Sequence, residues 1–296
     1  MISRRALLAS PLALMAARAA EAAGKMTLSM HQQTSAGAGY RGALEGWARA
    51  GIKNVELTAA SVDAFLKTDA LPAARRILTD LGLTPVSSAS GAFGIWEPGP
   101  NRPAAVENFK RRCEMFASLG LTRIYTPSAA TQKFTEDDYK TGADNMREIG
   151  VIAKQFGMTA MIEATRASTF VAALPTMLNM TRAAGNVAPL LDCYHFWSGP
   201  SKLEDLDLIR PGEIGHVHFQ DTPNIPRELL EQTTRVIPGE GIAPLPTILR
   251  KLANKGYAGA LSVELFLPKF TQGDPFEVAR EIRQKSEAVM RQAGVL

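Results

Sequence analysis

The sequence predicts an α/β fold, a single-domain (β/α)8 TIM barrel, and three observations lead to that prediction. Eight short apolar stretches alternate with longer amphipathic ones, which is typical of a parallel sheet with crossover helices. Eight such units in about 270 residues match the size of a closed barrel. No glycine-rich phosphate turn follows the first predicted strand, which weakens the competing open, doubly wound sheet.

Each predicted strand is short, rich in apolar or β-branched residues and bounded by turn residues. The eight predicted strands are Thr27–His31, Asn54–Thr58, Thr84–Ser88, Thr122–Thr126, Thr159–Ala164, Ala188–Tyr194, Ile214–Gln220 and Ala260–Leu265. Gly120 and Gly157 stand shortly before two of them, where a helix-to-strand turn commonly needs a left-handed residue.

Helical patterns fill the intervals between these strands. Thr135 is followed by three acidic residues, which indicates a helix N-cap with acids in the first turn. Asp274-Pro275 begins the last helix in the same manner, with proline at the first helical position. One apolar helix face is predicted by residues that recur at intervals of three and four: Val106, Phe109, Cys113, Phe116 and Leu119.

The first 23 residues differ in character from the rest of the chain. Arg4 and Arg5 precede an apolar run, and a stretch of small residues follows it. This order is typical of a secretory signal and is too short for a membrane anchor. The paired arginines favour the twin-arginine route over the general secretory route. We therefore expect a signal peptide at 1–23, a barrel domain at 24–296, export to the periplasm and no stable membrane anchor.

The composition and net charge give no indication of a nucleic-acid partner. Apolar residues make up 46% of the chain and charged residues 21%, ordinary values for a protein with a full core. Without residues 1–23, 30 basic and 28 acidic residues leave a net charge of +2, which gives no electrostatic case for nucleic acid. Cys113 and Cys193 have no metal-type spacing and are expected to be small buried hydrophobes. A homo-oligomer is left open.

The four histidines of the chain all fall in or just after predicted strands: His31, His195, His216 and His218. A parallel barrel strand is buried on both faces and is normally apolar. A charged or imidazole side chain there must therefore be hydrogen-bonded, paired or bound to metal. In this fold, polar residues at the carboxyl ends of strands form the active site.

The last four predicted strands each deliver one side chain that can bind a metal: Glu163, Asp192, His218 and Glu264. If they meet at the barrel axis, three carboxylates repel one another unless a cation neutralises them. Separate buried ion pairs are the alternative, but strong bases are scarce nearby and Arg166 is the nearest in sequence. We predict one divalent cation, manganese first, with magnesium, cobalt or zinc as alternatives for three oxygen ligands and one nitrogen ligand.

With these residues in view, the chain resembles the xylose isomerase-like barrel superfamily, in the group called sugar phosphate isomerases/epimerases. The resemblance covers essentially the whole chain after residue 23. It implies that Glu163, Asp192, His218 and Glu264 hold the metal, that the two glutamates also act as the acid/base pair, and that His195 contacts substrate. The matching stretches are Gly51–Leu57, Met161–Glu163, Asp192–His195, His216–Asp221, Pro238–Gly241 and Ser262–Glu264.

Five further residues complete the predicted site. His31 is expected to bind substrate hydroxyls, although a hydrogen-bonded core histidine explains it equally well. Trp96 is expected to cover the pocket and Arg227 to meet an anionic or hydroxyl group; surface packing and solvation are the respective alternatives. Glu56 is expected to support the site as a hydrogen-bond acceptor, and His216 to orient its neighbours below His218.

The leading functional hypothesis is a metal-dependent isomerase or epimerase that acts on a free sugar or keto-sugar by enediolate proton transfer. Export argues against phosphorylated substrates, which are held inside cells. The runner-up is a lyase or dehydratase that eliminates from a 3-keto-glycoside or a cyclic keto-polyol. An apurinic-site endonuclease is disfavoured, because such an enzyme needs more histidines and a basic face that this chain lacks. A catalytically silent sugar-binding protein is the non-enzymatic alternative.

Overall fold

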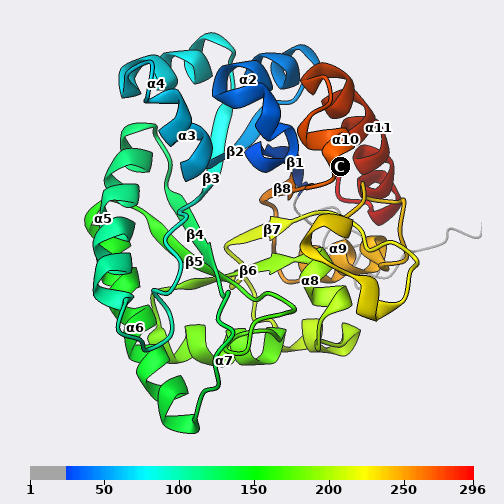
Figure 1. The fold of residues 1–296 in the computed structure, drawn as a ribbon. Coiled ribbons are helices and arrows are strands. Elements are labelled where there is room, and N and C mark those ends of the chain that lie inside the picture. Colours follow the sequence, from blue (N-terminus) through cyan, green and yellow to red (C-terminus); the bar gives the residue numbers. More distant parts are fainter. Residues whose placement is uncertain (1–24) are drawn as a thin grey trace, which may run out of the picture.

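The computed structural model describes residues 25–296, in which eight parallel strands close into a barrel surrounded by helices (Figure 1). Each strand pairs with the next in sequence, and β8 pairs with β1. The predicted (β/α)8 architecture is therefore confirmed. The strands are β1 (Thr27–His31), β2 (Asn54–Thr58), β3 (Thr84–Ala89), β4 (Arg123–Pro127), β5 (Thr159–Glu163), β6 (Ala188–Asp192), β7 (His216–His218) and β8 (Ala260–Val263).

The last four strands are shorter than the sequence predicts, β5 by one residue, and their true ends matter for the site. Strand β6 stops at Asp192 because its carboxylate accepts the backbone N–H of His195 at 2.7 Å and caps a short helix. Strand β7 ends at His218, and β8 ends one residue before Glu264. The side chains predicted to bind metal consequently stand at, or directly after, the ends of their strands.

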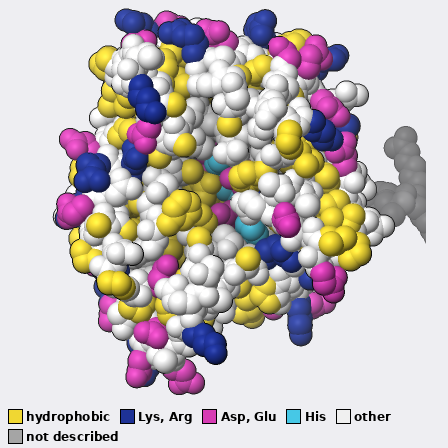
Figure 2. Space-filling model, viewed as in Figure 1, with side chains coloured by type: hydrophobic (Ala, Val, Ile, Leu, Met, Phe, Trp, Pro, Cys, Tyr) yellow, Lys and Arg dark blue, Asp and Glu magenta, His cyan; other side chains and the backbone are white. Residues whose placement is uncertain are grey.

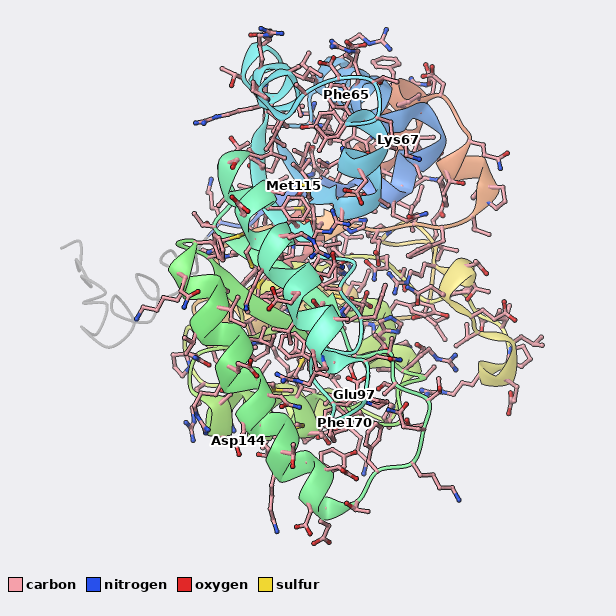
Figure 3. All side chains as sticks on the ribbon, turned by 60° about the vertical axis from the view of Figure 1, so that its left-hand side comes forward. Phe65, Lys67, Glu97, Met115, Asp144 and Phe170 are labelled. Carbon is pink, nitrogen blue, oxygen red and sulfur yellow. The ribbon has the colours of Figure 1, made fainter. Side chains whose placement is uncertain are left out.

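Helices form the outer layer, and Figure 3 shows α5 and α6 on one flank, with Met115 on the first and Asp144 on the second. The predicted caps of α6 and α11 are present, since Thr135 accepts the N–H of Asp138 and Asp274 that of Glu277. The α-helices are α2 (Gly39–Arg49), α3 (Ala59–Phe65), α4 (Leu71–Asp80), α5 (Arg102–Ser118), α6 (Glu136–Gln155), α7 (Leu174–Ala184), α8 (Cys193–Ser198), α9 (Leu245–Asn254), α10 (Pro268–Thr271) and α11 (Pro275–Ala293). Short 3-10 turns are η1 (Gln32–Ala38), η2 (Leu203–Leu208), η3 (Arg227–Leu229) and η4 (Gln232–Thr234).

The interior of the barrel has an apolar side and a polar side. Tyr125, Met161 and Leu190 form a small apolar cluster along β4, β5 and β6. The other strands contribute buried polar side chains, which alternate with core residues along each strand. These are Ser29, His31, Glu56, Ser87, His216, His218 and Ser262. The polar side therefore carries three of the four histidines toward the carboxyl ends of the strands.

Candidate metal centre

Four side chains from consecutive strands converge at the carboxyl end of the barrel. Glu163, Asp192 and His218 are the last residues of β5, β6 and β7, and Glu264 follows β8. One ligand atom from each lies within 4.8 Å of the others, and all four residues are at most 5% exposed. The closed barrel brings these strand ends together, as the sequence predicts.

The separations between these atoms fit a shared cation. The Nδ1 atom of His218 lies 2.9 Å from Glu163 Oε1, 3.6 Å from Asp192 Oδ2 and 3.8 Å from Glu264 Oε2. Ligand atoms at about 2.0–2.2 Å from one ion necessarily lie within roughly 4 Å of one another. Three carboxylates and one imidazole also form a donor set that suits a divalent cation.

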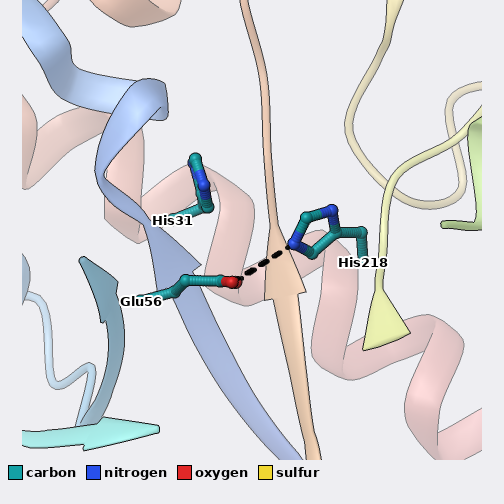
Figure 4. Close-up of side chains that lie close together, drawn as sticks. All are labelled: His31, Glu56 and His218. Carbon is teal, nitrogen blue, oxygen red and sulfur yellow. Dashed lines mark hydrogen bonds and ion pairs between the residues drawn. The ribbon is translucent and has the colours of Figure 1, made fainter. Parts of the chain in front are cut away.

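Glu56 contacts His218 at Nε2, as Figure 4 shows, whereas Glu163 contacts the other ring nitrogen, Nδ1. The Oε2 atom of Glu56 is 3.2 Å from His218 Nε2 and 3.1 Å from His216 Nε2. A carboxylate in this position fixes the tautomer and orientation of a histidine that binds metal through its other nitrogen. His31, Glu56 and His218 also lie close enough to hold an ion, but that group shares His218 with the first.

Arg235, which was not predicted from the sequence, is a fully buried residue that pairs with the carboxylates. Its Nη1 atom contacts Glu264 Oε2 and lies 3.2 Å from Asp192 Oδ2. Its Nη2 atom lies 2.8 Å from His195 Nε2. The expectation that strong bases are scarce near these carboxylates is therefore wrong. A bound cation would share the oxygens of Asp192 and Glu264 with this guanidinium.

The loop between β7 and α9 carries Arg235 into the site. Asp221 pairs with Val236 through an isolated antiparallel bridge. The carboxylate of Asp221 also accepts the backbone N–H groups of Gly239 at 3.0 Å and Ala243 at 2.9 Å. Gly239 has a φ of 92°, and a Cβ atom on Gly241 would meet the carbonyl oxygen of Thr222 at 2.2 Å. The Pro238–Gly241 motif is thus a turn that folds around Asp221.

Burial and charge move the pKa values of the two glutamates in opposite directions. Burial raises the pKa of Glu163 to about 8, and the negative charges of Asp192 and Glu264 act in the same direction. Burial also acts to raise the pKa of Asp192 and Glu264, but the Arg235 guanidinium holds both below their ordinary values. In the metal-free protein, Glu163 is therefore protonated more readily than Glu264.

His218 and His195 also differ in charge. Burial acts to lower the pKa of His218, but the carboxylates of Glu56 and Glu163 overcome it and raise that pKa well above its ordinary value. Burial lowers the pKa of His195 to about 4, so its imidazole is neutral at physiological pH. His195 can therefore act as a neutral hydrogen-bonding group.

A cavity of about 580 Å³ opens above the centre, and Glu163 and Glu264 line it whereas Asp192 and His218 do not. In Figure 2, histidine and acidic side chains show at the bottom of a hollow in the middle of this face. A second hollow of about 350 Å³ contains none of the four side chains, because it lies among residues at the opposite end of the barrel, such as Arg123 and Lys255.

The cavity includes two of the four residues predicted to bind substrate. His31 lines it, with Nε2 at 3.1 Å from Tyr125 Oη and 3.5 Å from Glu264 Oε1. His195, which α8 carries, also lines it. The structure therefore places both at the surface that a ligand would contact.

The other two do not line the cavity. Trp96 is fully buried and its Nε1 atom donates to the carbonyl of Thr126 at 3.0 Å, so it packs in the core rather than over the pocket. Phe93, from the same loop, lines the cavity instead. Arg227 donates to the carbonyls of Trp197, Ser198 and Gly199, which keeps its guanidinium away from the cavity.

Comparison with protein families gives a match over most of the chain. A family described as the xylose isomerase-like TIM barrel matches residues 44–291. A solved structure titled as the IolI protein with a bound zinc atom superposes with a TM-score of 0.84. That alignment covers 90% of this chain and 99% of the other at 22% identity, so it shows the fold alone.

Curated relatives match over a smaller share of the chain. The inosose isomerase of Halalkalibacterium halodurans is 30% identical over 172 residues, which are 56% of this chain and 61% of the relative. The 3-dehydroshikimate dehydratase of Pseudomonas putida is 26% identical over 239 residues, 75% of this chain and 35% of the relative. The chain thus matches about three fifths of the length of the first relative and a third of the second.

The expected export to the periplasm is wrong, because the inosose isomerase relatives are cytoplasmic. The predicted signal peptide, residues 1–23, lies outside the described residues. Within residues 25–296, none of the helices has the length and apolar character needed to cross a bilayer. Export was the reason to expect an unphosphorylated substrate, and that reason no longer holds.

Proposed function

The chain belongs to the xylose isomerase-like TIM barrel family, and we propose that it is a divalent-metal-dependent isomerase or epimerase of a free sugar or keto-sugar. One observation carries the proposal: of the four side chains that could hold a cation, Glu163 and Glu264 also line the cavity. These two carboxylates can therefore reach a substrate as well as a metal. The inosose isomerase relatives support the same reaction class.

Glu163, Asp192, His218 and Glu264 would hold the cation. When bound, a divalent ion stabilises the negative charge that develops on the oxygen of a ketone beside the reacting carbon. Manganese is our first candidate because it suits carboxylate-rich sets. Zinc is the second, since the IolI neighbour holds it. Glu56 would keep His218 oriented through the hydrogen bond to its Nε2 atom.

Proton transfer would be divided between the two glutamates. Arg235 keeps Glu264 ionised, which suits a general base that removes the proton next to the ketone. Glu163, the other carboxylate that lines the cavity, would return a proton to the neighbouring carbon or the opposite face. His31 and His195 line the same cavity and would hydrogen-bond the substrate hydroxyls.

The cavity favours a sugar without phosphate. Among the described residues that line it, Arg166 is the only lysine or arginine. Its guanidinium already donates to the carbonyl oxygens of Leu230 at 2.5 Å and Arg227 at 3.2 Å. A phosphate group needs free arginine, lysine or clustered backbone N–H groups. A neutral sugar or cyclic polyol ketone needs none of these.

A dehydratase is the second candidate, supported by the 3-dehydroshikimate dehydratase relative. The same proton abstraction beside a ketone would then expel a hydroxyl or alkoxy group from the next carbon. This relative is the more distant one, and the match spans only 35% of its length. Release of water or an alcohol, rather than equilibration of two isomers, would identify the lyase.

Proton exchange in D₂O tests the proposal even when the product is unidentified. Protein loaded with Mn²⁺ is incubated with an inosose, ketohexoses and 3-keto-sugars, and deuterium incorporation is followed by mass spectrometry. We expect exchange with at least one ketone, its loss with a chelator, and its return on adding metal. A protein that holds one ion per chain but exchanges no proton across the panel would contradict the proposal.

A further inference from the structure

The wall of the cavity is chemically unlike its floor. At the floor lie His31, Tyr125, Glu163, His195 and Glu264, all buried and polar. Of the other lining residues, nine are apolar and form what we call the wall: Ala59, Ala60, Ala89, Phe93, Pro127, Ala129, Ala167, Leu230 and Phe266. Six are polar: Gln33, Thr58, Thr165, Arg166, Glu231 and Gln232. A bare sugar carries a hydroxyl on almost every carbon, and each needs a hydrogen-bond partner when buried. The floor supplies such partners, whereas the side chains of the nine wall residues supply none.

The cavity is also larger than one sugar ring requires. Its volume is about 580 Å³, inside the range of about 300–1,000 Å³ that holds drug-sized ligands. A single six-membered polyol is much smaller than such a ligand. A ketone that reacts with Glu163 and Glu264 must place its ring on the floor. The apolar wall is then left to contact another part of the same molecule.

Exposed apolar side chains mark two of the segments that form this wall. Phe93 is 58% exposed, in a loop between two glycines of positive φ, Gly91 and Gly94. Leu229 is 61% exposed and directly precedes Leu230, which lines the cavity. Figure 2 shows hydrophobic side chains around the hollow. Apolar surface gathered beside a polar site is typical of a ligand groove.

We propose that the ligand of this cavity is a sugar with an apolar substituent, an alkyl or aryl group joined to the ring through oxygen. The ring would occupy the polar floor, and the substituent would pack against Phe93, Leu230 and Phe266. This inference rests on the proposed function, because a keto-sugar at the two glutamates is what orients the ring.

A series of alkyl β-glucosides, from methyl to hexyl, tests the inference by calorimetric titration of the metal-loaded protein. Each added methylene that packs on the wall tightens binding by about fourfold. Phe93→Ala should reduce this gain. Val151→Ala is the matched control, because Val151 is 51% exposed on α6 and does not line the cavity. The inference is overturned if no glucoside binds, or if affinity does not rise with the length of the alkyl chain. It is also overturned if Phe93→Ala shows the same gain in affinity per methylene as the unsubstituted protein.

Proton exchange separates this inference from the proposed function. The KM for exchange is compared between an unsubstituted inosose and 3-keto-glucosides with methyl, butyl and phenyl groups. A KM that falls as the substituent grows supports both claims. Exchange with a KM indifferent to the substituent overturns the inference and leaves the proposed function intact. Tighter binding of long alkyl chains without exchange of any ketone supports the wall assignment and contradicts the proposed function.

Discussion

The floor and the wall of the cavity are formed by neighbouring segments but are stabilised in different ways. At the floor and the metal centre beneath it, buried charges stabilise one another, and the Arg235 guanidinium contacts both Asp192 and Glu264. On the wall the side chains are uncharged, although the Arg235 guanidinium lies over the Phe266 ring at 5.0 Å from its centroid. Removing one floor charge leaves its partner uncompensated. Removing a wall side chain changes only apolar contact area. Substitutions on the floor should therefore have the larger effects.

The largest effect is expected from Arg235→Met in protein kept metal-free with a chelator. Asp192 and Glu264 would then be buried without their cation, which should lower the free energy of unfolding by about 3–5 kcal/mol. Arg41→Met is the control, since Arg41 and Glu45 form an exposed pair at 3.6 Å and should contribute about 0–1 kcal/mol. Urea denaturation measures both variants. Equal stability of the two would mean that Arg235 does not neutralise the floor.

Glu264→Gln should leave a folded barrel with turnover lowered by about a hundredfold or more, because the amide cannot accept a proton. Glu240→Gln is a suitable control, as Glu240 forms a surface pair with Lys285. Turnover is followed by deuterium exchange and folding by circular dichroism. Near-normal activity of the first variant would remove Glu264 from the proposed acid/base pair.

Glu56→Gln tests the carboxylate that contacts the Nε2 atom of His218. Loss of a carboxylate behind a ligating histidine typically weakens metal binding by about 10–100-fold. Competition with a metal-binding dye gives the affinity directly. An unchanged affinity would show that His218 is oriented without Glu56, in spite of the 3.2 Å contact.

The most gradual effect is the dependence of metal binding on pH. Because the pKa of Glu163 is raised to about 8, a cation must displace its proton at lower pH. Displacing that proton makes affinity fall by about tenfold for each pH unit below 8, and the fall should be steeper still because the His218 imidazolium must also release a proton. The raised pKa also means that protonation stabilises the metal-free fold. That stability is fully present below the ordinary pKa of 4.5 and is lost as pH rises through about 8.

Chelator competition between pH 6 and 8.5 measures the affinity, and thermal unfolding of metal-free protein measures the stability. Constant affinity over this interval would contradict the raised pKa of Glu163.

The four candidate metal ligands could be predicted from the sequence because one rule determines where they meet. Consecutive parallel strands must place their carboxyl ends together in a closed barrel. Residues at those ends, such as Glu163 and Asp192, therefore converge whatever path the loops take. Glu56 and His216 follow from the alternation of side chains along β2 and β7.

Loop residues could not be placed in this way. The bridge between Asp221 and Val236 brings Arg235 to Asp192 and Glu264, and no periodic pattern in the sequence predicts that bridge. The only signal was its position three residues before the Pro238–Gly241 turn. Trp96 and Phe93 lie three residues apart in one loop, and the backbone path past two positive-φ glycines decides which of them reaches the cavity.

The central claim is that one divalent ion binds between β5, β6, β7 and β8. Anomalous diffraction from crystals grown with Mn²⁺ tests it most directly. We predict a single peak within about 2.0–2.3 Å of one atom from each of Glu163, Asp192, His218 and Glu264. Absence of a peak there, or a peak between His31 and Glu56 instead, would contradict it.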